Sequence, residues 1–175
     1  MNYFYIYVFT LSTTLTFIGY GTLLANIIDK KLLKSNLGYI GLMGLLTCTL
    51  ISYTTIFFTK HGYLHNVILH LIGLSIFTYF ILNKRIKFRV RTFLIIFSVL
   101  FIGLLILRNH DDFNYYHLTY SLGLTENKLI VGLGNLGHGY THHSSIFFLN
   151  SILYLPIIKY FLFHSIGWIT LFFVN

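Results

Sequence analysis

The sequence predicts an all-α membrane protein, a polytopic bundle of five to six transmembrane helices. Of its 175 residues, 56% are hydrophobic and only 9% are charged, whereas a soluble domain carries about 25% charged residues. Such a small number of charged residues cannot cover the surface of a water-soluble globule. The composition therefore excludes a soluble enzyme, a secreted disulfide scaffold and a disordered tail. The single proline, Pro156, leaves long helices nearly uninterrupted. The lipid bilayer is therefore the first partner that we expect.

Four apolar runs of membrane-spanning length follow one another in the first part of the chain. They cover residues 3–28, 38–58, 64–82 and 92–107, and crossing ~30 Å of hydrocarbon takes ~20 residues. The first run has no basic amino-terminal region and no small-residue cleavage site. We therefore interpret it as a helix that stays in the membrane and not as a signal peptide. The fourth run is shorter but still adequate for a span.

A last apolar run covers residues 145–175, and Pro156, Lys159 and His164 interrupt it. Two alternatives stay open: one span that is kinked or split at Pro156, or a re-entrant or interfacial helix followed by a span. The sequence does not decide between these two alternatives because of Lys159, since a lysine in the middle of a membrane is costly unless it is paired or reaches the interface. We expect one transmembrane domain over residues 1–175. Because the chain stops in membrane-type sequence, we expect it to be the N-terminal part of a larger protein.

The distribution of basic residues predicts the orientation of the helices. The first and third loops hold eight of them: Lys30, Lys31, Lys34, Lys84, Arg85, Lys87, Arg89 and Arg91. The second and fourth loops hold three: Lys60, Arg108 and Lys128. Cytoplasmic loops are enriched in Lys and Arg, so we place the loop over 108–144 outside, in a multi-pass protein of the bacterial inner membrane. The net charge of +8 is then a topology signal and does not predict a nucleic-acid partner.

A glycine pattern in this loop resembles a nucleotide-binding motif without its context. Gly132, Gly134 and Gly137 fit G-x-G-x-x-G after a short strand-like stretch. The dinucleotide fingerprint also needs a βαβ unit and an acidic residue about 20 positions further on. No acidic residue follows Glu126, so we interpret the glycines as permitting a tight backbone path.

The best candidate site is the stretch 110–117, where His110 and His117 flank Asp111 and Asp112. If the segment is helical, Asp112 shares a face with Tyr116. Adjacent carboxylates raise each other's pKa, and such a pair can act as a general base on a sugar hydroxyl or hold a divalent cation. The alternative is a helix start, where aspartates are favoured, with aromatic residues at the membrane interface.

Several histidines are further polar candidates. His138, His142 and His143 follow the glycines without a cysteine or an H-E-x-x-H pattern, so we assign no metal site to them. They fit better as donors to a lipid-linked phosphate, and the alternative is a solvated interfacial loop. For His65 and His70, early in the third run, we expect packing or a helix–helix hydrogen bond.

The stretch 109–118, together with the Gly- and Ser-rich sequence after it and 147–151, resembles the first outer loop of GT-C-type membrane glycosyltransferases. It is similar above all to uncharacterised bacterial polytopic proteins related to them, whose loop carries an acidic residue shortly before Tyr-His. The resemblance covers residues 108–152. This chain places the loop after its fourth run and offers five or six spans, whereas family members place it after the first and have eight or more.

That resemblance implies an enzyme that uses a polyprenyl-phosphate-linked sugar at the outer face. Asp111 or Asp112 would be the catalytic base, with Asp112 favoured, and His117 would contact a phosphate or hydroxyl group. We also expect His110, Tyr116 and the three later histidines to contact substrate. The alternative is a non-enzymatic polytopic protein, a transporter or flippase component, for which only the interrupted run after 145 provides a hint.

Overall fold

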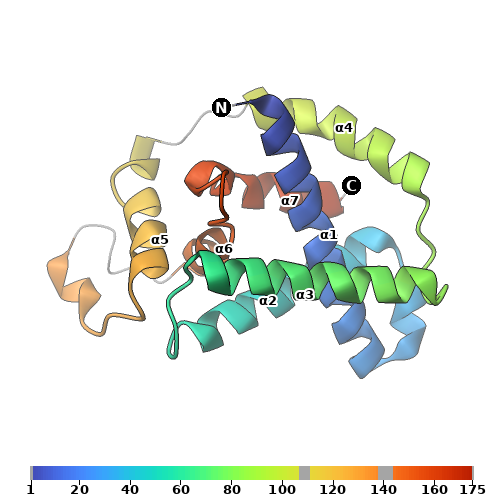
Figure 1. Ribbon diagram of the computed structural model, residues 1–175, viewed down its shortest axis with the longest axis horizontal. Coiled ribbons are helices and arrows are strands. Elements are labelled where there is room, and N and C mark those ends of the chain that lie inside the picture. Colours follow the sequence, from blue (N-terminus) through green and yellow to red (C-terminus); the bar gives the residue numbers. More distant parts are fainter. Residues whose placement is uncertain (1, 107–110, 138–143, 175) are drawn as a thin grey trace. The chain divides into compact units, whose positions relative to one another are not determined.

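The computed structural model describes residues 2–106, 111–137 and 144–174, and within these ranges it is all-α, with seven α-helices and no strand. The α-helices are α1 (Tyr3–Ile28), α2 (Leu37–Thr55), α3 (Tyr63–Leu82), α4 (Val90–Ile106), α5 (His117–Glu126), α6 (Ser145–Ile152) and α7 (Ser165–Val174) (Figure 1). Four 3₁₀ turns connect them: η1 (Lys30–Lys34), η2 (Asp111–Phe113), η3 (Leu133–Leu136) and η4 (Tyr160–Leu162).

The chain divides into two compact units. Unit 1 comprises residues 1–48, 69–107 and 167–175, and unit 2 comprises 49–68 and 108–166. The helices α2, α3 and α7 each contribute residues to both units. Each unit is described by itself.

Three helices are long and apolar enough to cross a membrane, namely α1, α2 and α3. They coincide with the first three predicted runs, and α1 covers the same residues, 3–28. The helix α4 also follows its prediction, but with 17 residues it is shorter, and α7 has only 10. The membrane character predicted from composition is thus supported by three spans, which is fewer than the five to six expected.

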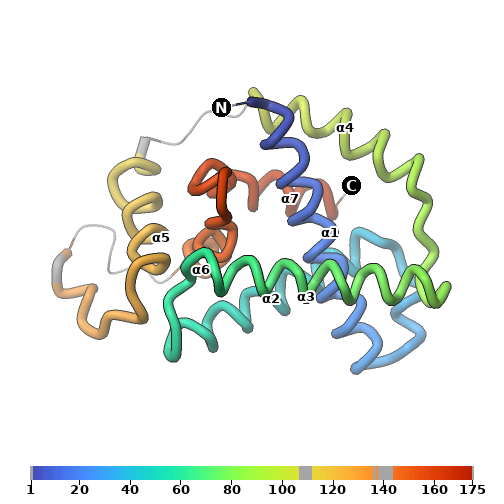
Figure 2. The backbone as a smooth tube through the Cα atoms, in the orientation of Figure 1, coloured from blue at the N-terminus to red at the C-terminus, as the bar shows by residue number. Residues whose placement is uncertain are grey.

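The last apolar run is split into two helices. Between α6 and α7 the chain takes an irregular path, which Figure 2 traces. Leu155 pairs with Lys159 in an isolated bridge, and Ile157 and Lys159 have positive φ angles of 71° and 50°. Pro156 cannot donate the backbone hydrogen bond that a continuing helix needs, which explains why no single helix runs through this segment. Lys159 is exposed.

Unit 1 is built around α1, which approaches its neighbours through glycines. A Cβ atom on Gly19 would collide with the carbonyl group of Gly73 in α3. A Cβ on Gly44 in α2 would collide with the carbonyl of Phe17, and would lie 3.1 Å from the amide nitrogen of Gly21. Small residues allow such close approach of helix backbones, which is a common way of packing helices in membranes. Of the two alternatives expected for His70, packing or a helix–helix hydrogen bond, the structure shows the second, with 3.5 Å between Nε2 and the hydroxyl of Thr13 in α1.

A second contact in unit 1 is aromatic. Phe93, Phe97 and Phe101 lie one turn apart on α4 and are all buried. Trp168 of α7 packs edge-on against Phe97 at 5.2 Å between ring centroids, and its indole N–H donates to the carbonyl of Leu100 at 2.7 Å. Edge-to-face pairs at this distance add about 0.5–1.5 kcal/mol beyond area burial. The aromatic row therefore fixes α7 against α4.

Candidate functional site

The predicted acidic pair lies in unit 2, in the 3₁₀ turn η2, just before α5. The carbonyl group of Asp112 accepts hydrogen bonds of 3.2 Å from the backbone amides of Tyr115 and Tyr116. From the sequence we considered a helix in which Asp112 and Tyr116 share a face. In the structure α5 begins only at His117, so these two residues do not lie on one continuous helix. Asp112 is half-buried; the side chain of Asp111 lies outside the described part of the structure.

Aromatic and imidazole rings surround this acidic turn. Phe113 is buried and meets the ring of His164 at 4.7 Å between centroids. The rings of Tyr116 and His117 lie 4.4 Å apart, and the ring of His117 contacts Phe147 at 5.1 Å. His164 brings a buried Nδ1 atom that has no hydrogen-bond partner. Of the predicted site residues, the structure thus gathers Asp112, Tyr116 and His117 around one end of α5.

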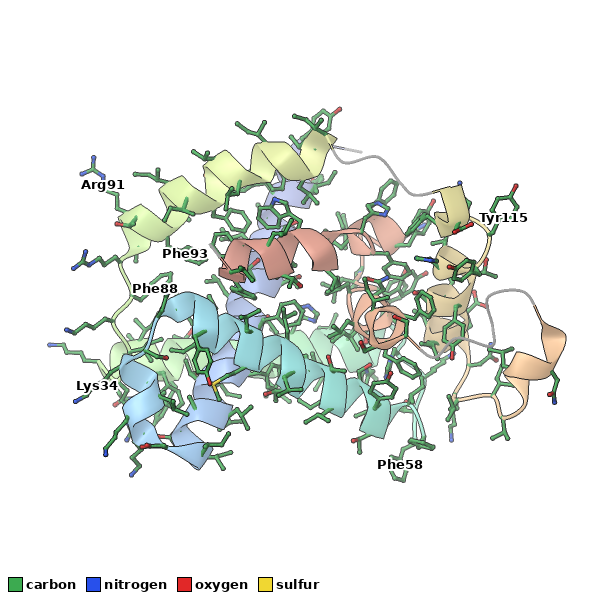
Figure 3. All side chains as sticks on the ribbon, turned by 180° about the vertical axis from the view of Figure 1, so that it is seen from behind. Lys34, Phe58, Phe88, Arg91, Phe93 and Tyr115 are labelled. Atoms are coloured by element: carbon green, nitrogen blue, oxygen red, sulfur yellow. The ribbon has the colours of Figure 1, made fainter. Side chains whose placement is uncertain are left out.

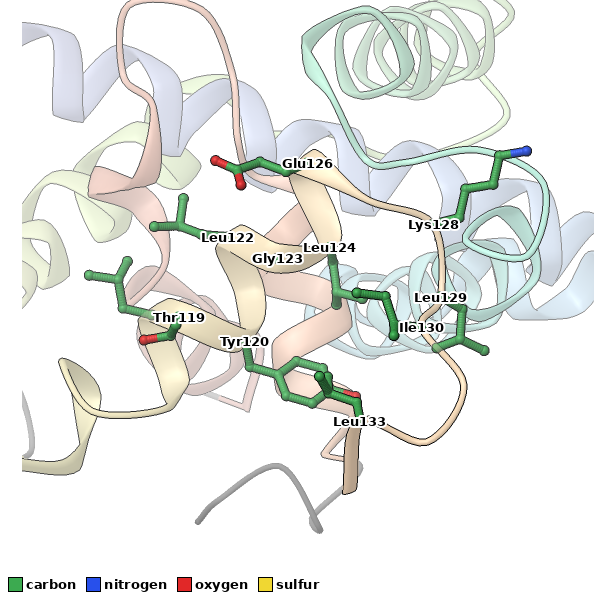
Figure 4. A pocket seen from close by; sticks show the side chains of 11 residues that line it. Thr119, Tyr120, Leu122, Gly123, Leu124, Glu126, Lys128, Leu129, Ile130 and Leu133 are labelled. Atoms are coloured by element: carbon green, nitrogen blue, oxygen red, sulfur yellow. The ribbon is translucent and has the colours of Figure 1, made fainter. Parts of the chain in front are cut away.

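A pocket of about 400 Å³ lies beside α5, and we call it the α5 pocket. Its lining is mostly apolar and comes from α5 and from the segment after it: Leu118, Thr119, Tyr120, Leu122, Gly123, Leu124, Glu126, Lys128, Leu129, Ile130 and Leu133. Glu126 and Lys128 supply the two charges, and their charged groups point away from each other (Figure 4). Burial, and secondarily the neighbouring Tyr53, raise the pKa of Tyr120. This pocket suits a ligand with a long apolar part and one charged group.

Unit 2 also contains a buried polar network that joins the α2–α3 loop to α6. His61 Nδ1 lies 2.6 Å from the hydroxyl oxygen of Ser151, and its Nε2 lies 3.1 Å from that of Thr55. The amide nitrogen of Asn66 donates to the carbonyl oxygens of His61 and Ser151, both at 2.8 Å. The ring of His65 stacks on that of His61 at 4.8 Å. We call these five residues the polar network.

Each ring nitrogen of His61 has a hydroxyl partner. The hydroxyl of Ser151 lies 2.8 Å from the carbonyl of Phe148 as well as 2.6 Å from His61 Nδ1, so it bridges the two groups. The Asn66 amide nitrogen faces carbonyl oxygens, so its Oδ1 faces His65 Nδ1, at 2.8 Å, and must accept from it. A neutral His61 is satisfied at both ring nitrogens.

The short contact between Ser151 and His61 invites comparison with a nucleophile–base pair, but the chemistry argues against it. Both side chains are fully buried. Burial, and secondarily the nearby His65, lower the pKa of His61 to about 3, against a weaker opposing hydrogen bond with Ser52. A general base works best with a pKa near the operating pH. We therefore assign His61 a structural role, which is to join the α2–α3 loop to α6.

The remaining predicted site residues, His110, His138, His142 and His143, lie outside the described residues. Within the described ranges, no group of three or more His, Cys, Asp or Glu side chains is placed to hold a metal ion. The glycine stretch forms the turn η3, and Gly132 and Gly137 have positive φ angles of 83° and 70°. These values agree with the tight backbone path predicted for the glycines.

Sequence reasoning missed the polar network because its members come from α2, the α2–α3 loop, α3 and α6. His61 and Ser151 are 90 positions apart. The one available signal was Asn66, an amide at the start of an apolar run, because polar residues in such runs usually bond to a neighbouring segment. His65, for which we expected packing or an interhelical bond, bonds to Asn66 of its own helix.

We compared the chain with protein families, curated proteins and solved structures. No protein-family model, curated protein or solved structure matches the chain.

Proposed function

We propose that the protein transfers a sugar from a polyprenyl-phosphate donor to an acceptor hydroxyl at the outer face of a bacterial inner membrane. The observation that carries the proposal is the position of the acidic turn at the start of α5, the helix that lines the α5 pocket. A half-buried carboxylate and an apolar pocket for a polyprenyl chain are two elements that this reaction needs.

The chemistry assigns a role to each of these groups. The carboxylate of Asp112 takes the proton of the acceptor hydroxyl, and the acceptor oxygen attacks the anomeric carbon of the sugar. The bond from that carbon to the phosphate oxygen breaks, and polyprenyl phosphate leaves with the bonding electrons. The α5 pocket holds the first isoprene units of the donor. His117, beside Tyr116, contacts the sugar or the phosphate.

The membrane topology of this proposal keeps five to six spans, with the loop over 108–144 outside. At ~1.5 Å per residue, the 17 residues of α4 extend over most of the ~30 Å hydrocarbon layer. The α7 helix, with 10 residues, is too short to cross the membrane alone.

The test is transfer of a radiolabelled sugar from a polyprenyl-phosphate donor by the purified protein. We expect Asp112→Asn to lower kcat by 10²- to 10⁴-fold, the usual contribution of a general base. The matched control is Asp29→Asn, which changes the same charge in unit 1, where Asp29 caps η1 by accepting from the amide of Lys31. Equal activity of wild type and Asp112→Asn would remove this carboxylate from the mechanism.

A second candidate, a non-enzymatic transporter or flippase component, is favoured by one observation. The helix interruption between α6 and α7 resembles the broken helices of transporters, and Ser121, Asn150 and His164 nearby in unit 2 each carry a buried polar atom without a hydrogen-bond partner. Reconstituted vesicles distinguish the two. A transporter moves a fluorescent lipid-linked substrate across the bilayer with Asp112→Asn as well as with wild type, and transfers no sugar.

A further inference from the structure

Unit 1 has a basic pocket where the first and third loops meet. Lys34 comes from η1, and Lys84, Arg85 and Lys87 come from the segment after α3; all four line one cavity of about 340 Å³. Two buried side chains, Leu33 and Ile86, anchor the two loops on either side. Four cations from separate loops therefore face a shared space.

These cations have no acidic partner among the described residues of unit 1. Asp29 is the acidic residue of this unit, and it caps η1 through the amide of Lys31. The side chains of Lys34, Lys84 and Lys87 are exposed, while the guanidinium of Arg85 lies 5.6 Å from the centre of the Tyr79 ring. An excess of positive charge in one pocket attracts an anion.

The backbone at Lys84 adds an independent observation. Its amide and that of Arg85 bond to the carbonyls of Ile81 and Phe80, at 2.9 and 3.0 Å, which closes the end of α3 in a Schellman motif. Lys84 occupies the left-handed position of this motif, with φ of 53°, where glycine is usual and less strained. A lysine at this position places a charge at the pocket at the expense of backbone strain.

An apolar pocket of about 300 Å³ adjoins the basic one, and the two share Leu37 and Lys87. Its apolar lining comes from α2, α4 and α7: Leu37, Gly38, Phe93, Ile96, Phe172 and Phe173. A Cβ on Gly38 would collide with the carbonyl of Phe173, so glycine there lets α2 and α7 meet at the base of the pocket. Figure 3 shows Phe93 within the unit and Lys34 and Arg91 extending from it.

We infer that these two pockets together form a binding site for an anionic phospholipid, with the phosphate headgroup in the basic pocket and the start of an acyl chain in the apolar pocket. The charge complementarity selects a phosphate-bearing ligand, and basic pockets beside membrane helices bind such headgroups. The apolar pocket that continues from Lys87 selects a lipid over a free phosphate ion, which would leave this surface uncovered. The inference does not depend on the proposed transfer reaction.

The test is titration of the full chain, purified in a neutral detergent, with dioleoyl phosphatidylglycerol, followed by native mass spectrometry. We compare Lys34→Gln/Lys84→Gln/Lys87→Gln with a control, Lys30→Gln/Lys31→Gln/Arg91→Gln, which removes the same charge from the same loops but outside both pockets. Because each basic residue near an anionic lipid contributes about a fivefold change in affinity, we expect the pocket variant to bind on the order of 100-fold more weakly. We expect the control variant to bind within about threefold of wild type.

Further arms identify the ligand. We expect neither phosphatidylcholine nor inorganic phosphate to compete. Filling the apolar pocket by Ile96→Trp should weaken phosphatidylglycerol binding, whereas Ile95→Trp, an exposed neighbour on α4 outside this pocket, should not. Equal losses in the two triple variants would overturn the inference in favour of a general surface potential. Competition by inorganic phosphate would overturn it in favour of a simple anion site, and equal effects of the two tryptophans would exclude the acyl chain from the pocket.

Discussion

Asn66 is the side chain whose removal should destabilise unit 2 most. Its amide nitrogen donates to three carbonyl oxygens, those of His61, Ser151 and Tyr154, at 2.8, 2.8 and 2.9 Å, and its Oδ1 accepts from His65. The Ser151 carbonyl keeps a second donor, the amide of Tyr154 at 3.3 Å, but Asn66→Ala removes the amide donor from the other two carbonyls and the acceptor of the His65 N–H. Each buried polar group left without a partner costs about 1–3 kcal/mol. We therefore expect Asn66→Ala to lower the free energy of unfolding by about 2–6 kcal/mol.

The same helix provides a matched control. Asn83 follows the other end of α3, is exposed, and makes one side-chain hydrogen bond, to the carbonyl of Tyr79 at 2.8 Å. An exposed substitution of this kind changes stability by about 0.5 kcal/mol or less. Thermal unfolding in detergent, followed by circular dichroism, measures both variants, and hydrogen exchange locates the loss. If Asn66→Ala and Asn83→Ala differ by less than about 1 kcal/mol, or if exchange rises equally in unit 1, the reasoning is refuted.

Three further predictions concern pH, packing and access. Because burial lowers the pKa of His61 from 6.5 to about 3, the unfolded chain binds the proton first. The free energy of unfolding should fall by about 2 kcal/mol between pH 6.5 and about pH 4.5. Denaturant titrations of His61→Gln should lack this drop, and an unchanged drop would contradict the assignment. Gly44→Leu should destabilise the protein by about 1–3 kcal/mol because the added side chain overpacks the α1–α2 contact. Gly103→Leu, with open space around its Cβ, should not destabilise it. Equal melting temperatures of the two variants would contradict this packing. Two single cysteines, in a background without the native Cys48, test the orientation of the loop. On whole cells an impermeant maleimide should label Asn114→Cys, which is exposed, but not Ser121→Cys, which is fully buried. Labelling of Asn114→Cys only after the membrane is opened would place the loop inside.

How much of the fold the sequence predicts depends on the kind of signal. The bounds of α1, α2 and α3 follow from charge-free runs of membrane length, because burying a charge in hydrocarbon is costly whatever the neighbours are. The apolar run over residues 145–175 does not predict its helix bounds in this way. Its apolar residues fit a continuous or a broken helix equally, and the outcome depends on the local effects of Pro156 and Lys159.

The acidic site stays a prediction, and the sequence indicates its position in the chain but not its conformation. Adjacent aspartates before Tyr-His locate the site in the sequence, and the structure brings Asp112, Tyr116 and His117 to one end of α5. The turn at Asp112 and the neighbouring ring of His164 depend on contacts across about fifty residues of chain, which no local pattern encodes. For the same reason the polar network could not be read from the sequence.

The aromatic contact between α4 and α7 makes the protein its own optical reporter. The chain has a single tryptophan among 14 tyrosines, and the indole of Trp168 is buried against Phe97 with its N–H bonded to the Leu100 carbonyl. Its emission therefore reports one contact only, and a red shift signals water reaching the surface between α4 and α7. Because α7 also lines the apolar pocket of unit 1 through Phe172 and Phe173, lipid entry or release there can be followed by fluorescence without any added label.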